Sequence, residues 1–437
     1  MRDLFVAIVV FGLLPMALSR PHVGIYLWSW IGYHNPHRLA FGWAFNFPWA
    51  MIIALATLVG MLFSKEPKRI PWTRETVLLL IFVLWMAVTT YFALYPALAW
   101  EQFVKVFKVL LMTYATLIVI NNRERLNGLI WVICISLGFY GIKGGIFTIS
   151  KGGVHRVQGP DGTFFGGNNE MALVLAMIIP LLAYLRLQEK RHWLRLGLAG
   201  AMMLSAIAAI GSQSRGGLLG LASMGVFLWL KSRNKLMTGL MIVSSVLIIG
   251  SIMPQAWYDR MNTINTYEQD QSSMGRINAW WTAYNVAKVR ITGGGMEMFR
   301  PATFAQYAPN PDNVHDVHSI YFEQIGEQGF IGFAIFVLLG LMTWMRCNQI
   351  MRLGKKDPER KWAADLAAMI QVSMVGYATA GAFLGLSYFD LYYHLIAITV
   401  LTWSFIRNQE TPAVASTTTK TMTAIKPFSR RAVARTN

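Results

Sequence analysis

Long apolar segments alternate with short polar ones along most of this 437-residue chain. Four stretches contain no charged residue, at 39–64, 76–100, 236–258 and 366–389. Apolar runs longer than about 18 residues are typical of helices that span a bilayer. The pattern therefore predicts an all-α polytopic membrane protein.

The alternation predicts about twelve spanning helices, at 3–19, 41–62, 75–95, 103–121, 127–149, 169–187, 196–212, 216–231, 236–253, 329–346, 363–386 and 388–406. The chain then divides into a helical region at 1–253, a long loop at 254–328, three further spans at 329–407 and a tail at 408–437. The tail is rich in Thr, Ala and basic residues, so we expect it to be disordered and cytoplasmic.

The loop at 254–328 is the largest segment outside the predicted spans. Within it, 274–290 repeats apolar residues at spacings of three and four, which predicts a short amphipathic helix. Trp257, Trp280 and Trp281 are suited to the membrane interface. We therefore expect short helices that lie on the bundle.

Composition agrees with a membrane protein, since hydrophobic residues make up 55% of the chain and charged residues only 14%. The formal net charge is +18, a value that could also indicate a nucleic-acid partner. The distribution of the basic residues decides between these readings. Alternate loops, with both termini, hold 26 of the 39 Lys and Arg residues, whereas the opposite side holds ten.

Cytoplasmic loops collect Lys and Arg, so this asymmetry predicts that both termini are cytoplasmic and that 254–328 lies outside. The positive charge is then mostly topogenic, and we expect no nucleic-acid partner. The only cysteines, Cys134 and Cys347, lie in separate apolar stretches, which does not indicate redox or zinc chemistry.

The first candidate site is Ser214-Arg215-Gly216-Gly217, at the predicted outward start of a span. A helix N-terminus offers free N–H groups, and an arginine fork binds oxyanions in a bidentate manner. Glycines there would let a ligand approach the backbone. The alternative is a tight turn whose arginine reaches the membrane surface.

The second candidate is the glycine-rich segment 151–170, which contains Arg156 and ends at another outward helix start near Asn169. The third is Glu101, Lys105 and Lys108, which share one helix face and could look into a cavity. The alternative interpretation of the glycine-rich segment is a flexible loop. The alternative for the Glu101 cluster is an ion pair on the surface.

The fourth candidate is the polar run from Asp312 to Tyr321, which contains His315 and His318. Its D-x-x-H-D-x-H spacing could hold a metal, but no further ligands are evident, so we expect no metal. Acid–base or oxyanion chemistry by His318 is the preferred interpretation. Three more polar residues could support the site, namely Arg276, Arg300 and Asp390.

Taken in order, Ser214-Arg215-Gly216-Gly217 before a span, a long outward loop, and His318-Ser319-x-Tyr321-x₄-Gly326-x₂-Gly329 before the next span resemble the O-antigen ligase/polymerase family. The resemblance covers about 160–335 by motif. Ser319 stands where many of its ligases have Asn. Residues 1–39 further resemble O-glycosylation ligases linked to exosortase systems.

The resemblance implies an inner-membrane glycosyltransferase of GT-C type with a periplasmic active site and no cofactor or metal. It would transfer a glycan from undecaprenyl pyrophosphate to an acceptor such as lipid A-core. By motif, Arg215 matches the family's essential arginine, His318 its loop histidine, Arg276 a second arginine and Asp390 a late aspartate. The donor's pyrophosphate charge would be stabilised by Arg215 and Arg156, with Lys105 and Lys108, and His318 would deprotonate the acceptor.

Two rivals within the family are a polymerase and a protein O-glycosylation ligase, which use the same donor. A lipid-linked-oligosaccharide transporter is a rival from another class. A transporter is expected to carry mid-membrane polar groups in two repeated halves, whereas the polar clusters here fall on one side.

Overall fold

The computed structural model describes residues 1–232, 234–262 and 271–408, and this part of the chain is helical without a strand. The N-terminal helices are α1 (Arg2–Ser19), α2 (Pro21–His34), α3 (Trp49–Phe63), α4 (Arg74–Tyr91), α5 (Pro96–Val119), α6 (Arg123–Ser150), α7 (Asn168–Gln188) and α8 (His192–Gly211). The C-terminal helices are α9 (Arg215–Lys231), α10 (Lys235–Ile252), α11 (Gln255–Asn262), α12 (Gln271–Val289), α13 (Pro301–Tyr307), α14 (Ile320–Gly354), α15 (Lys361–Gly381) and α16 (Asp390–Asn408). Short 3₁₀ turns lie at Pro36–Leu39, Trp43–Phe45 and Pro358–Arg360.

The expected all-α polytopic membrane fold is confirmed. A helix lies at the position of each predicted span, and seven described helices are long and apolar enough to cross a bilayer: α1, α4, α5, α6, α7, α8 and α14. The full number of twelve crossings stays a prediction. The predicted disordered tail at 408–437 lies outside the described residues, apart from Asn408 at the end of α16.

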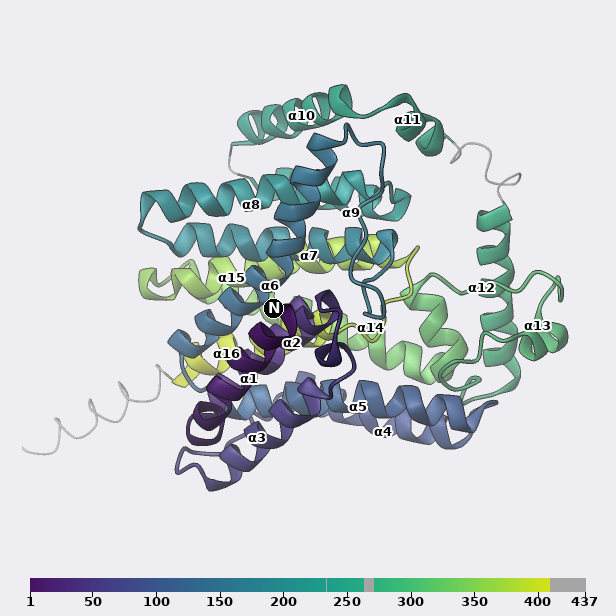
Figure 1. Cartoon of the computed structure of the whole chain (residues 1–437), viewed down its shortest axis with the longest axis horizontal. Helices are drawn as coiled ribbons and strands as arrows, with labels where there is room; N and C mark the ends of the chain where they lie inside the picture. The colour runs from purple at the N-terminus through teal and green to yellow at the C-terminus, as the bar shows by residue number, and fades with distance from the viewer. Residues whose placement is uncertain (233, 263–270, 409–437) are drawn as a thin grey trace, which may run out of the picture.

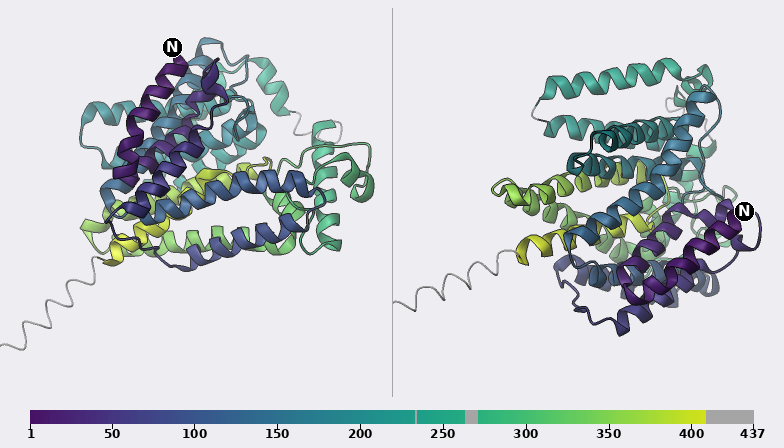
Figure 2. Two further views of the ribbon diagram at one scale, coloured as in Figure 1. Left: turned by 60° about the horizontal axis from the view of Figure 1, so that its bottom comes forward. Right: turned by 60° about the vertical axis from the view of Figure 1, so that its left-hand side comes forward.

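Most long helices run in one common direction, and α12 lies across their ends with α13 beside it (Figures 1 and 2). We call this end of the bundle the α12 end. The expected short helices of the long loop are therefore present. The helix before this loop in the chain, α10, packs on α9 at the edge of the bundle.

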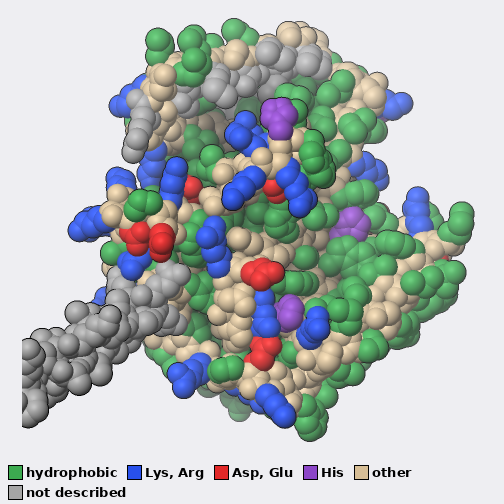
Figure 3. Space-filling view, turned by 90° about the vertical axis from the view of Figure 1, so that its left-hand side faces the viewer, with side chains coloured by type: hydrophobic (Ala, Val, Ile, Leu, Met, Phe, Trp, Pro, Cys, Tyr) green, Lys and Arg blue, Asp and Glu red, His purple; other side chains and the backbone are tan. Residues whose placement is uncertain are grey.

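Ion pairs and hydrogen bonds join several loops at the opposite end. Arg125 at the start of α6 donates two hydrogen bonds to Glu66, at 2.5 and 2.7 Å. Arg346 donates two to Glu75, and Arg123 stacks over the Trp362 ring. Lys and Arg side chains are spread over this face (Figure 3). We call it the basic end.

The start of the chain differs from the prediction, because an additional helix, α2, follows α1 after Arg20 alone. The Asp3 carboxylate accepts hydrogen bonds from the N–H groups of Gly42 and Ala44, so the N-terminus lies beside the α2–α3 loop. At the other end of this hairpin, the Tyr26 hydroxyl donates to the Arg125 carbonyl.

The two ends of the described chain consequently lie at opposite ends of the bundle. Arg407, near the end of α16, contacts Trp403 beside Arg346 at the basic end, whereas Arg2 donates to the Leu39 carbonyl of the α2–α3 loop. The structure thus has a hairpin of α1 and α2 where a single span was expected, whereas the side of the membrane on which each terminus lies stays a prediction.

Candidate active site

A tight turn positions Arg215 as the first residue of α9. The Ser214 hydroxyl caps the helix by accepting from the N–H of Gly217 at 3.1 Å. Ser212 Oγ accepts from the N–H of Ser214, and Gln213 takes a left-handed conformation with φ of 57°. Serine at an N-cap satisfies one of the free N–H groups of the first turn, so the sequence itself fixes this helix start.

The two glycines after Arg215 pack α9 against its neighbours. A Cβ on Gly217 would lie 2.5 Å from Cβ of Ala172 in α7, and one on Gly216 would lie 3.1 Å from Cβ of Phe383. Small residues at such contacts let helices approach closely in a membrane. Both glycines therefore allow the close packing of α9 against its neighbours, and their predicted role in admitting a ligand to the backbone stays a prediction.

A pocket of about 270 Å³ lies directly at this helix start. Its lining comes from α9, from α12 and from the α15–α16 loop, and comprises Arg215, Gly216, Leu219, Ser273, Arg276, Ile277, Trp280 and Phe383. Arg215 and Arg276, far apart in sequence, therefore face one cavity. Two guanidinium groups at a helix N-terminus are chemically suited to a doubly charged oxyanion.

The loop that carries His318 is fixed to α12 by hydrogen bonds. Trp280 donates from Nε1 to the Val317 carbonyl at 2.8 Å, and its ring stacks on Phe322 at 5.0 Å. The Asn278 amide donates to the carbonyls of Asn310 and Asn313. Trp280 lines the arginine pocket and also bonds the polar run at Val317, so it holds this run next to the pocket.

His318 has an unusual backbone conformation, with φ of 41° in the left-handed region. Such a conformation is uncommon for residues other than glycine and marks a position determined by its surroundings. Its side chain is 29% exposed, and Nδ1 lies 3.7 Å from Oδ2 of Asp316. Burial lowers the pKa of His318 below its usual 6.5, more than the Asp316 carboxylate raises it.

The charges around His318 come from several elements. The positive charge of Arg276 lowers the pKa of His318, and Glu170 near the start of α7 raises it. His315, which bonds Asn313 through Nδ1 at 3.0 Å, has a smaller lowering effect. Arg276 is therefore close to both the pocket and the histidine. The imidazole is mostly neutral at neutral pH, which is the form that accepts a proton.

The glycine-rich segment also reaches the α9 start. Gln213 donates to the carbonyls of Gly153 and Val154, and Arg156 Nε donates to Gln213 Oε1 at 3.4 Å. The Asn168 amide donates to the Ser212 carbonyl at 2.9 Å. The predicted convergence of the two outward clusters is present, although Arg156 itself is exposed and Asn169 is simply the second residue of α7.

Four other candidates lie apart from the arginine pocket. Lys105 pairs with Glu101 at 3.0 Å, with both side chains more than half exposed, and Lys108 is exposed as well. Lys105 and Glu101 thus form the surface ion pair that was the alternative to a cavity-facing cluster. Arg300 pairs with Glu297 at 2.6 Å, and Asp390 begins α16 near Gly32 of α2. None of them lines the pocket formed by the described residues.

A polar network that the sequence did not indicate supports the first turns of α14. Glu323 and Glu327 each accept from the segment after α15: the N–H of Ser387 bonds Glu323 at 3.0 Å, and the Tyr388 hydroxyl bonds Glu327 at 2.8 Å. Glu327 also accepts from the N–H of Glu297. The i, i+4 spacing of the two glutamates is visible in the sequence, but their partners lie 30 to 64 residues away along the chain.

Tyr321 extends the same helix start toward an apolar cavity. Its hydroxyl donates to the Ala378 carbonyl of α15 at 2.8 Å. A cavity of about 240 Å³ begins there between α14, α15 and α16, lined among others by Tyr321, Phe336 and Trp344. The histidine is thus followed within three residues by an apolar surface.

Comparison with known families agrees with this arrangement. Residues 200–337 match the family model described as O-antigen ligase, and residues 1–190 match DUF5935, a family of unknown function. No curated protein matches the chain. The O-antigen ligase match contains Arg215, Arg276 and His318, the three residues gathered around the pocket. Residues 200–337 are thus similar to O-antigen ligases, and this similarity supports a membrane glycosyl-transfer function of ligase or polymerase type.

Proposed function

We propose that this protein is an inner-membrane O-antigen ligase in lipopolysaccharide biosynthesis. It would transfer a glycan from undecaprenyl pyrophosphate to the lipid A-core oligosaccharide on the periplasmic face. The observation that carries the proposal is the joint lining of one pocket by Arg215 and Arg276, with His318 in electrostatic range of Arg276.

The pocket suits the pyrophosphate of such a donor. Its charge rises as the glycan departs, and arginine forks and a helix N-terminus stabilise developing negative charge. Arg156, tethered through Gln213 to the turn before Arg215, can approach from the pocket rim. The apolar cavity beside Tyr321 offers a surface for part of the polyprenyl chain.

In the proposed reaction the acceptor hydroxyl attacks C1 of the donor sugar from the face opposite the pyrophosphate. His318 accepts the hydroxyl proton, the new C1–O bond forms, and the bond from C1 to the pyrophosphate oxygen breaks. Configuration at C1 is thereby inverted. The lowered pKa of His318 supports this role, because the base must be neutral before it reacts.

The proposal includes a metal-independent reaction. Cationic side chains occupy the position where a metal-dependent enzyme would gather carboxylates, since Arg215 and Arg276 face the pocket. Transfer by the purified protein should therefore survive EDTA. A requirement for Mg²⁺ or Mn²⁺ would contradict this part of the proposal.

The periplasmic assignment is supported by the charge distribution between the two ends. Basic side chains are spread over the end opposite to α12 (Figure 3), as the positive-inside rule expects of a cytoplasmic face. The arginine pocket includes residues of α12 and so belongs to the other end.

Deletion of the gene followed by gel analysis of lipopolysaccharide tests the proposal. We expect loss of long-chain bands while the lipid-linked polymer is retained. Loss of the polymer itself would identify a polymerase instead. Unchanged lipopolysaccharide with an under-glycosylated protein would identify a protein O-glycosylation ligase, as the exosortase-linked resemblance of residues 1–39 suggests.

A further inference from the structure

A second pocket, of about 490 Å³, lies at the basic end, far from the α12 end. It runs between α4, α14 and α16 and is open at the surface. We call it the α4–α16 groove. Its lining consists of Trp72, Thr73, Arg74, Val77, Leu78, Ile81, Met342, Arg346, Trp403 and Arg407.

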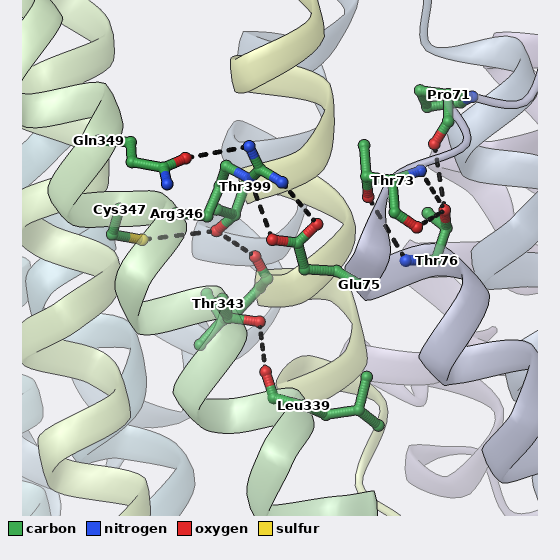
Figure 4. Close-up of polar contacts among 11 residues, drawn as sticks. Pro71, Thr73, Glu75, Thr76, Leu339, Thr343, Arg346, Cys347, Gln349 and Thr399 are labelled. Carbon is green, nitrogen blue, oxygen red and sulfur yellow. Dashed lines mark hydrogen bonds and ion pairs between the residues drawn. The ribbon is translucent and has the colours of Figure 1, made fainter.

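One of the three arginines in the groove is neutralised by a buried partner. Arg346 donates from Nε and from its terminal nitrogen to both carboxylate oxygens of Glu75, at 2.9 and 3.2 Å, and to Gln349 at 3.0 Å (Figure 4). Glu75 is only 2% exposed. This pair fixes α4 to α14 and adds no net charge to the groove.

The other two arginines retain their charge. Within the described ranges, neither Arg74 nor Arg407 has a carboxylate within ion-pair distance, and both side chains are exposed. Arg407 lies over the Trp403 ring at 5.7 Å, and Arg346 lies over the same ring at 4.6 Å. Among the described residues, the groove therefore has two arginines without a carboxylate partner.

Below the arginines the groove is apolar. Val77 and Ile81 are successive residues on one face of α4, 44% and 46% exposed, and Met342 of α14 lies across from them. Both α4 and α14 are long and apolar enough to span a bilayer. Trp72 and Trp403 also line the groove, and tryptophan is enriched at membrane interfaces.

We propose that the α4–α16 groove binds an anionic phospholipid. Arg74 and Arg407 hold the phosphate, and an acyl chain lies along Val77, Ile81 and Met342. Arginine forks match phosphate oxygens, and basic pockets between spanning helices on the cytoplasmic side suit anionic headgroups. The first turn of α4, capped by Thr73, adds the positive end of a helix dipole.

Other occupants fit the groove less well. A free phosphate would leave the long apolar part empty. The chain beyond Glu410 contains five Lys or Arg residues and no Asp or Glu, so it has the same sign of charge as the groove. The inference is independent of the proposed glycosyl transfer, because the groove is at the other end of the bundle.

Native mass spectrometry of the full-length protein can test this lipid site. The wild type is offered phosphatidylglycerol and phosphatidylcholine in equal amounts, beside the double variant Arg74→Gln/Arg407→Gln. A matched control, Arg191→Gln/Arg195→Gln, removes two exposed arginines from the start of α8, also at the basic end. Glu75 and Arg346 stay unchanged, so the buried pair continues to hold the helices.

We expect the wild type and the control to retain phosphatidylglycerol preferentially, and the double variant to lose that preference by about tenfold to thirtyfold. Equal retention of both lipids by the wild type, or an equal loss in the control, would overturn the proposal. Displacement of the lipid by millimolar inorganic phosphate would instead indicate a simple anion site. The single variant Arg407→Gln, at an exposed helix end, should show part of the loss without affecting folding.

Discussion

Nδ1 of His318 lies 3.7 Å from Oδ2 of Asp316, too far for a direct hydrogen bond. The carboxylate therefore acts on the imidazole mainly through its charge, and burial outweighs it. The result is a histidine whose pKa lies below 6.5 and which is mostly neutral at neutral pH. This relationship makes the role of His318 accessible to measurement.

Replacement of His318 by Ala or Gln should lower turnover by about 10²–10⁴-fold while donor affinity is retained, because only the base is lost. In the wild type, activity should persist down to about pH 6.5 and fall in more acidic solution. The lowered pKa of His318 means that its imidazole is protonated only at a lower pH than a free histidine. Turnover and donor affinity across pH 5 to 8 check this. If His318 bound phosphate as a cation, both would decline together in the variants, and activity would rise as the pH falls.

Arg215→Lys should lose most activity, because a lysine keeps the charge but not the bidentate fork that faces the pocket. Arg215→Ala should in addition weaken donor binding. Arg195→Lys, an exposed substitution at the opposite end, is the matched control and should behave as the wild type. Unaltered donor affinity in Arg215→Ala would show that the pyrophosphate is bound elsewhere.

Cysteines introduced in place of Phe41 and Val314 should react with a membrane-impermeant thiol reagent added from outside, whereas one at Lys68 should not. Phe41 is 90% exposed in the α2–α3 loop, beside Arg2. The native Cys134 and Cys347 are buried, which keeps the background low. Labelling of Phe41 together with Lys68 would contradict a crossing of the bilayer by α3, which lies between them.

Glu75→Gln should destabilise the protein more than Glu66→Gln does. The first removes a partner from a buried pair, which costs about 3–5 kcal/mol, whereas the second opens a pair whose glutamate is 38% exposed, worth about 1 kcal/mol or less. Thermal unfolding in detergent measures the difference, and equal shifts in melting temperature would refute the ranking.

The Glu66 pair should also respond to acid. Its hydrogen bonds from Arg125 lower the pKa of Glu66 below its usual value. A carboxylate with a depressed folded-state pKa contributes stability above its unfolded value, about 4.3, and loses it as the pH falls through the folded value. The difference in stability between wild type and Glu66→Gln should therefore shrink below about pH 4.

The helix positions could be predicted because apolar runs record burial in a bilayer directly. The hairpin of α1 and α2 could not, since 14 residues are too short for an expected span and Arg20 looked like a loop residue. Counting the Lys and Arg residues on each side does not distinguish the hairpin from a single first span either. The hairpin exchanges the sides of Arg2 and Arg20, and each contributes one positive charge, so the 26-to-10 asymmetry is unchanged.

The meeting of Arg215 with the 151–170 segment could be predicted, because both follow outward helix ends. The selection of Arg276 over Lys105 as the pocket's second cation could not be, since a helix face of lysines satisfies the same local pattern. It depends on where α12 lies across the bundle, and that placement is set by contacts such as Trp280 with Val317. Such a contact joins residues far apart in the chain, and the local pattern of apolar and polar residues does not indicate it.

Gly329 divides α14 into two parts that respond to different surroundings. Its φ of 67° and ψ of −179° are accessible almost only to glycine, and a Cβ there would lie 2.3 Å from the Ile291 carbonyl oxygen. Before this break, Gln328 is hydrogen-bonded to Thr89 and Tyr388, so the part next to His318 is tied to the frame of the protein. After it, the helix is apolar and belongs to a segment long enough to cross a bilayer. The direction of the segment next to His318 is therefore set by its own hydrogen bonds, and it is not simply the continuation of the axis of the apolar helix.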